Sequence, residues 1–135
     1  MKKHSNKSTE DFLFAMLQIY EEGNSDIKLV DISLKLGISR AAATKMSIKL
    51  SSNSLIEKTR YSKIRLTKKG KKFAIEVARK HRIIEVFLDK KLGLSGKELE
   101  EQAHAMEHSI NKKTLERLSV FMNNPDVCPH GKKTY

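Results

Sequence analysis

Three side chains in the last third of the sequence have the chemistry and the spacing of a metal site. His104, Glu107 and His108 stand at positions i, i+3 and i+4, so on a helix all three project from one side. Two imidazoles and a carboxylate at this spacing can hold one divalent cation. A single histidine is more commonly structural than metal-bound, but the three together favour a metal site.

A fourth histidine supports the same interpretation. His81 stands in an apolar stripe of the preceding predicted helix, and Glu85 follows one turn later. The stripe consists of Phe73, Val77, Ile84 and Leu88. The alternative for His81 is a neutral structural histidine of the core. Because His81 occurs together with the other three side chains, we favour metal binding.

The same string of residues suggests a peptidase as an alternative. Residues 104–108 match the H-x-x-E-H pattern of the inverzincins, in which the glutamate is the general base for a zinc-bound water. Such an enzyme needs a further carboxylate ligand and a substrate cleft well beyond the motif, yet Glu116 and Asp126 are the only acids after His108. The sequence also lacks a nucleophilic triad and a phosphate-binding glycine loop, so we expect a binding protein and not an enzyme.

Basic charge in the middle of the chain indicates a polyanionic partner. The sequence has 27 Lys and Arg against 16 Asp and Glu, a net charge of +11. Residues 35–72 contain twelve of the basic residues and a single acid, Glu57, so this segment carries the whole excess. A basic run is usually a solvated face, but its confinement to one segment favours a phosphate-binding surface.

The elements predicted around this segment form a winged helix. Residues 30–36 read as a short helix that Gly37 ends, and Ser39 caps a second helix from Arg40 to about Leu50. A helix, a turn with glycine and a capped helix have the spacing of a helix-turn-helix. Residues 57–66 then alternate as a basic hairpin, which in this position is a wing against the phosphate backbone.

The second helix begins with small and basic residues, which suits contact with base edges. The alternative is an alanine-rich helix chosen only for its propensity. The candidate DNA contacts are Ser39, Arg40, Ala41, Ala42, Thr44, Lys45 and Lys49 in the helix and Lys58, Arg60 and Lys63 in the hairpin.

The predicted fold is therefore mainly α. We expect a winged-helix DNA-binding domain with a small β-wing over residues 1–72, an all-α dimerisation and metal-binding domain over 73–124, and a C-terminal tail over 125–135. Residues 128–135 of this tail are expected to be an unstructured end or a linker. Three amphipathic helices of this size bury little apolar surface alone, so a homodimer is expected.

The composition of the chain restricts the cellular compartment in which we expect the protein. The mean hydropathy is −0.51, and no apolar run approaches the ~20 residues of a membrane-spanning helix. Cys128 is the only cysteine, which excludes a disulfide scaffold, and the basic start lacks the apolar stretch of a secretory signal. We expect a cytoplasmic protein without a membrane partner.

Taken in order along the chain, these segments resemble the diphtheria-toxin-repressor/manganese-transport-regulator (DtxR/MntR) family. The matching segments are TEDFL at 9–13, DISLKLGIS at 31–39, LTKKG at 66–70, KHRIIE at 80–85, MEH at 106–108 and NPDVCPHG at 124–131. The resemblance is to a short form without the SH3-like domain of larger members. It implies a homodimeric, metal-dependent repressor of metal-uptake genes that binds a pseudo-palindromic double-stranded DNA operator.

The resemblance also implies residue roles. Asp11 matches a first-helix metal ligand of manganese-type members, and His81 matches the ligand of the long helix. Glu107 and His108 match the central ligand pair. His104 stands where iron-type members have cysteine and manganese-type members have glutamate.

A second metal site and the choice of metal follow from the same comparison. Glu85 and Glu100 match positions that some members use at a second site. The family implies Fe²⁺ or Mn²⁺, whereas the histidine content also suits Zn²⁺, Co²⁺ or Ni²⁺. Phe14 replaces a second carboxylate of manganese-type members, and Ala41 replaces a proline of the iron-type recognition helix.

The expected mechanism is a cation that bridges the DNA-binding and dimer domains and so favours operator binding. Two alternatives stay open. One is a winged-helix regulator with a non-metal effector and structural histidines. The other, which we favour less, is a metal-buffering protein or metallo-hydrolase with an incidental basic surface.

Overall fold

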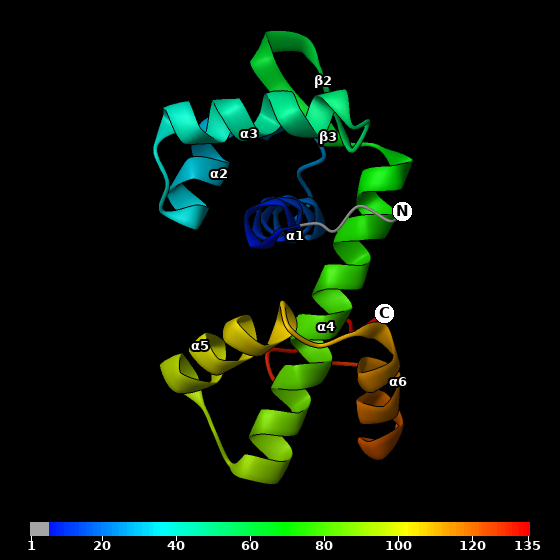
Figure 1. Ribbon diagram of the computed structural model, residues 1–135. Coiled ribbons are helices and arrows are strands. Elements are labelled where there is room, and N and C mark those ends of the chain that lie inside the picture. The colour runs from blue at the N-terminus through cyan, green and yellow to red at the C-terminus, as the bar shows by residue number, and fades with distance from the viewer. Residues whose placement is uncertain (1–5) are drawn as a thin grey trace. The chain divides into compact units, whose positions relative to one another are not determined.

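The computed structural model describes residues 6–135, which form two compact units (Figure 1). The N-terminal unit ends at Ile75, and the C-terminal unit is Glu76–Tyr135. Residues 6–135 are mainly helical with one small sheet, so the predicted fold class is confirmed. No helix among these residues is long and apolar enough to cross a lipid bilayer.

Helix α1 (Lys7–Glu21) supplies much of the core of the N-terminal unit. Asn6 caps it, because the Asn6 side chain accepts a hydrogen bond of 2.8 Å from the backbone N–H of Thr9. Its fully buried side chains are Phe12, Leu13, Met16 and Leu17. The helical spacing of these apolar residues fixes which face of α1 turns inward.

Helices α2 (Leu29–Leu36) and α3 (Arg40–Ser52) form the predicted helix-turn-helix. Gly37 ends α2 with a φ of 66°, a conformation that glycine adopts at no steric cost. The Ser39 hydroxyl then accepts a hydrogen bond of 3.0 Å from the backbone N–H of Ala42 and starts α3. Two short local signals thus set the geometry between the helices.

An antiparallel sheet completes the N-terminal unit. Its strands are β1 (Ile27–Lys28), β2 (Ile56–Lys58) and β3 (Lys63–Leu66), in the order β1-β3-β2. Ile27 pairs with Ile64, and Ile56 pairs with Leu66. Strands β2 and β3 are the predicted wing, and the three-residue segment η1 (Arg60–Ser62) joins them.

Helix α4 (Lys68–Leu92) begins against the segment that precedes the wing. The Thr67 hydroxyl donates a hydrogen bond of 2.7 Å to the Ser54 carbonyl oxygen and accepts one of 2.9 Å from the Gly70 N–H. A Cβ at Gly70 would lie 1.8 Å from the Leu55 carbonyl oxygen. Only glycine therefore permits this approach of helix to loop.

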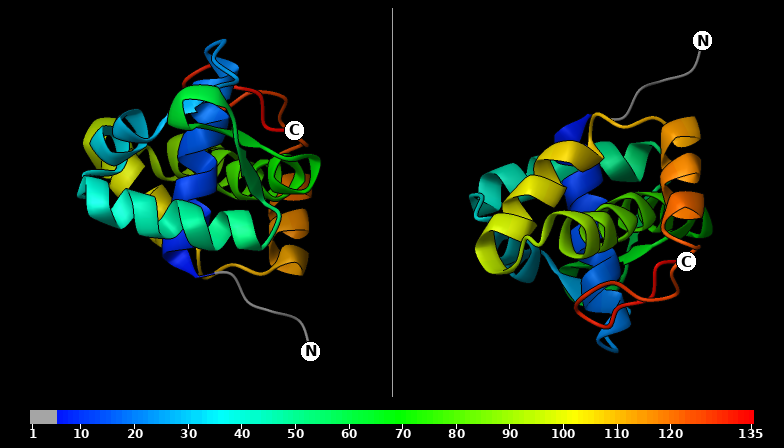
Figure 2. Two further views of the ribbon diagram at one scale, coloured as in Figure 1. Left: turned by 90° about the horizontal axis from the view of Figure 1, so that it is seen from above. Right: turned by 90° about the horizontal axis from the view of Figure 1, so that it is seen from below.

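The C-terminal unit packs α5 (Gly96–Glu107) and α6 (Lys112–Phe121) on opposite sides of the C-terminal half of α4 (Figure 1, Figure 2). The core between α4 and α5 consists of Ile84, Leu88, Leu99 and Ala103. Because α4 and α5 pack face to face, the polar residues on their facing sides also lie close to one another.

The last residues of the chain are ordered, which corrects the prediction of an unstructured end over 128–135. Val127 pairs with Lys133 as an isolated β-bridge, and the Thr134 N–H donates a hydrogen bond of 3.0 Å to the Asp126 carbonyl oxygen. The guanidinium of Arg82, a residue 2% exposed, donates one of 2.9 Å to the Lys133 carbonyl oxygen. The segment is ordered by a partner far away in sequence, which local patterns do not reveal.

Candidate metal centre and DNA-facing surface

Helices α4 and α5 bring imidazoles and carboxylates together in the C-terminal unit. His81 and Glu85 come from α4, Glu107 ends α5, and His108 is the C-cap residue of that helix. His81, Glu85 and Glu107 are 8%, 2% and 0% exposed. Burial of so many ionisable groups is costly unless each is paired or binds a metal.

A first cluster consists of His104, Glu107 and His108, whose ligand atoms lie within 4.8 Å of one another. The Nε2 atom of His108 lies 3.5 Å from Oε2 of Glu107. The imidazole rings of His104 and His108 meet edge to face, with their centroids 5.1 Å apart. Among residues 6–135, nothing donates a hydrogen bond to the buried Oε2 of Glu107. A buried carboxylate with an unsatisfied oxygen, grouped with two imidazoles, fits a divalent cation.

His81 lies between this cluster and a second one. Its Nδ1 is 2.5 Å from Oε1 of Glu107, and its Nε2 is 3.2 Å from Oε2 of Glu85. Burial alone would lower the pKa of His81, but hydrogen bonds and negative charge from Glu107 and Glu85 outweigh it and raise the pKa from 6.5 to about 10. His81 is therefore protonated at neutral pH without metal, and its charge offsets those of the carboxylates.

The second cluster joins α4, α5 and the C-terminal segment. Ligand atoms of Glu85, Cys128 and His130 lie within 4.8 Å of one another. His130 Nδ1 is 3.3 Å from Glu85 Oε2, and its Nε2 is 2.8 Å from Glu100 Oε2. Ligand atoms of His81, Glu85 and Glu100 form an overlapping group within the same distance.

The pKa values of the two carboxyl groups of this second cluster, Glu85 and Glu100, are shifted in opposite directions. Burial raises the pKa of Glu100, and the negative charge of Glu85 raises it further. Burial would also raise the pKa of Glu85, but its hydrogen bond and charge interaction with His81 lower the pKa overall. Glu85 is thus the carboxylate that stays ionised and ready to bind a cation.

The predicted DNA contacts form an exposed surface of the N-terminal unit. All the candidates in α3 and its cap are exposed, whereas Ala43, Ser47 and Leu50 form the buried face of the helix. In the hairpin, Lys58 and Arg60 are exposed and Lys63 is half-buried. The structure therefore leaves basic and small side chains facing solvent on two neighbouring elements, as a phosphate-binding surface requires.

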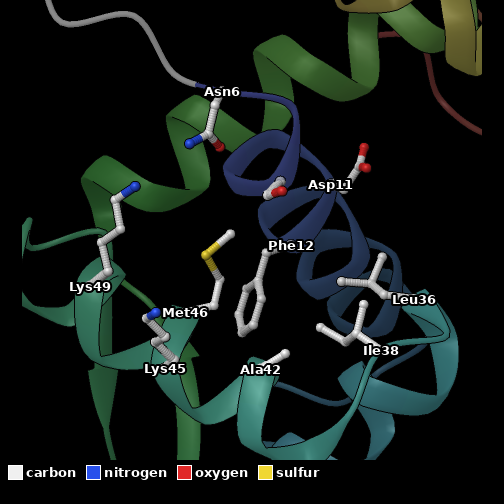
Figure 3. Close-up of a pocket in the computed structure, with 10 residues that line it drawn as sticks. Asn6, Asp11, Phe12, Leu36, Ile38, Ala42, Lys45, Met46 and Lys49 are labelled. Carbon is white, nitrogen blue, oxygen red and sulfur yellow. The ribbon is translucent and has the colours of Figure 1, made fainter.

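A pocket of about 460 Å³, which the sequence did not predict, adjoins α3 (Figure 3). Phe12, Ile38 and Met46 form its apolar part, and Lys45 and Lys49 lie along α3 at its edge. Because Lys45 is also a candidate DNA contact, the pocket lies beside the predicted DNA-reading face.

Comparison with known proteins decides the family. Residues 67–135 match the family described as "Iron dependent repressor, metal binding and dimerisation domain". The HTH-type transcriptional regulator MJ0568 of Methanocaldococcus jannaschii is 35% identical over 87% of this chain and 94% of its own length. The chain belongs to the iron-dependent repressor family. This confirms the predicted resemblance to DtxR/MntR regulators.

Solved structures of metal-dependent regulators share the fold of this iron-dependent repressor family member. The manganese regulator SloR superposes with a TM-score of 0.83 at 36% identity, over 98% of this chain and 60% of that one. A crystal structure of ScaR with bound Zn²⁺ gives 0.79 at 35% identity, over 96% and 59%. The chain thus spans about 60% of the length of these two regulators.

The structure groups most of the metal ligands predicted for this family member. His104, Glu107 and His108 form one cluster, Glu85 and Glu100 belong to the other, and His81 lies between them. Asp11 is a half-buried residue of α1 in the N-terminal unit, and its role as a ligand stays a prediction.

Sequence reasoning missed Cys128 and His130 as candidate ligands. The available signal was a thiol and an imidazole two residues apart, Cys-Pro-His, in a chain with a single cysteine. The sequence left the roles of Cys128 and His130 open, because residues 128–135 were expected to be unstructured. Their order in the C-terminal unit places both side chains beside Glu85.

Proposed function

We propose that this family member represses transcription by binding an operator through α3 and the β2–β3 hairpin, and that its DNA affinity rises when His104, Glu107 and His108 bind a divalent cation. The observation that carries this proposal is the buried Oε2 of Glu107, which has no hydrogen-bond donor among residues 6–135 and lies 3.5 Å from an imidazole nitrogen of His108. An unsatisfied buried carboxylate oxygen costs about 1–3 kcal/mol or more, so the site is built for a positive partner.

The donor set determines which cations the site takes. A bound divalent cation would supply positive charge beside the Glu107 carboxylate and accept the nitrogen lone pairs of the two imidazoles. We propose Fe²⁺ or Mn²⁺ from the family, and the imidazoles also accept Zn²⁺, Co²⁺ and Ni²⁺. Asp11 stays in the proposed ligand set as the contribution that the family resemblance predicts from the N-terminal unit.

The proposed assembly is a homodimer on double-stranded DNA. The family description names dimerisation for residues 67–135, and α6 exposes Val120 and Phe121 by 65% and 60%. Apolar side chains exposed together favour burial against a second copy. Two copies present two recognition helices, which read half-sites about 34–36 Å apart in a pseudo-palindromic operator.

The test uses a fluorescent duplex of the DNA directly upstream of the coding sequence, titrated with protein in Mn²⁺, Fe²⁺, Zn²⁺ or chelator. We expect metal to tighten wild-type binding by roughly 5- to 150-fold, the usual range of coupling between two sites. His108→Ala should bind as weakly with metal as without it. Gln102→Ala, an exposed position of the same helix, serves as the control and should keep the metal response. Equal wild-type affinity in metal and in chelator would contradict the proposal.

A further inference from the structure

An aromatic residue at the tip of the wing stands out among the exposed apolar side chains. Tyr61 is 88% exposed, the largest value among the large hydrophobic residues that face solvent in residues 6–135. It lies in η1, at the end of the β2–β3 hairpin. Among residues 6–75, no contact gives the ring a packing role, because so much of its surface meets solvent.

The backbone at this tip adopts a conformation that the residues disfavour. Tyr61 and Ser62 have φ of 63° and 60°, and the Lys63 N–H donates a hydrogen bond to the Arg60 carbonyl oxygen. This is a two-residue hairpin turn with two left-handed central residues, where Asn-Gly is the usual sequence. A bulky residue at such a position is strained, and strain of this kind concentrates at functional sites. The turn holds the tyrosine ring outward.

The charges around the ring select its partner. Residues 58–65 contain four basic side chains and no acid, and Lys58 and Arg60 are exposed beside Tyr61. A basic rim around an exposed aromatic ring fits a polyanion with apolar patches. The sugar-phosphate backbone of DNA has both, since the deoxyribose offers apolar contact and the phosphate accepts hydrogen bonds from tyrosine.

We propose that Tyr61 contacts the DNA backbone, with its ring against a deoxyribose and its hydroxyl donating to a phosphate oxygen. This inference rests on the proposed function and adds a residue to it. The contact carries no charge and reads no base edge. It therefore contributes affinity that is independent of both salt and sequence, unlike the contacts of the neighbouring lysines.

The experiment measures binding to a mixed-sequence 30-base-pair duplex in Mn²⁺ at several salt concentrations, together with the melting temperature. Tyr61→Asn removes the ring but keeps a residue that tolerates the left-handed turn. We expect it to bind at least about fivefold more weakly, with an unchanged slope of log K against log salt. Relief of strain should raise its melting temperature by about 3–6 °C.

Two matched variants separate the ring from the turn and from charge. Ser62→Gly relaxes the turn and keeps the ring, so we expect a higher melting temperature with wild-type affinity. Lys63→Ala should flatten the salt slope by about one unit. The Tyr61 contact would be overturned if Tyr61→Asn bound DNA as tightly as the wild type, or if Ser62→Gly lost as much DNA affinity as Tyr61→Asn. Either result leaves the proposed function standing as long as the wild type binds DNA in a metal-dependent way. Failure of the wild type to bind any duplex in metal would overturn both.

Discussion

At the scale of single residues, His81 shows how buried charge is balanced in the absence of metal. Its two ring nitrogens face Glu107 at 2.5 Å and Glu85 at 3.2 Å, and the residue is 8% exposed. The raised pKa of about 10 means that His81 is a cation throughout the physiological range. The sequence predicted a metal role for His81 because it occurs together with His104, Glu107 and His108. The partners on both sides of its ring come from tertiary packing.

The metal-free protein should lose stability at alkaline pH because of His81. The pKa of His81 is about 10 in the folded protein and 6.5 in the unfolded chain. Protonated His81 therefore stabilises the folded state fully below pH 6.5, and this contribution disappears as the pH rises through about 10. In chelator, we expect His81→Gln to be less stable than wild type by a few kcal/mol at pH 6 and to approach it near pH 10. Urea denaturation across this range measures the difference. A constant gap between the two proteins would contradict the charged state of His81.

Cys128 should act as a thiolate ligand of the second cluster. The residue is 5% exposed, and its sulfur lies within 4.8 Å of ligand atoms of Glu85 and His130. A coordinating thiol is deprotonated, and cobalt reports it through a thiolate-to-metal charge-transfer absorption. We expect this band in wild type titrated with Co²⁺ and in His108→Ala, but not in Cys128→Ser. Saturation of wild type with Co²⁺ without such a band would contradict the role of Cys128.

At the scale of elements, local signals predicted the helix-turn-helix and left other segments undetermined. Gly37 and Ser39 mark the end of one helix and the start of the next, and the structure uses both residues in this way. The turn at Tyr61 was not predictable, because its residues disfavour the conformation that they adopt. The order of residues 125–135 depends on the buried Arg82, which lies far away in sequence.

Gly70 should be indispensable for docking α4 against the segment that precedes the wing. A Cβ there would lie 1.8 Å from the Leu55 carbonyl oxygen, and backbone on both sides cannot yield as a side chain does. We expect Gly70→Ala to lower the free energy of unfolding by about 3 kcal/mol or more. Lys72→Ala, an exposed substitution in the same turn of α4, should change it by under about 0.5 kcal/mol. Similar stability of both variants in chemical denaturation would argue against this tight approach.

At the scale of the whole molecule, the chain separates its two kinds of chemistry. The basic excess lies within residues 35–72, whereas the candidate metal ligands His81, Glu85, Glu100, His104, Glu107 and His108 lie in the C-terminal unit. This division was predictable from charge and histidine spacing alone. The number of ligands per site was not, because ligands from α4, α5 and the C-terminal segment converge only on folding.

Thermodynamic reciprocity gives the most direct test that metal occupancy and operator binding are coupled. If metal tightens DNA binding by a given factor, DNA must tighten metal binding by the same factor. We therefore expect the Kd for Mn²⁺ to fall by roughly 5- to 150-fold when the upstream duplex is present, equal to the effect of Mn²⁺ on the Kd for that duplex. An Mn²⁺ affinity that is the same with and without the duplex would contradict the account.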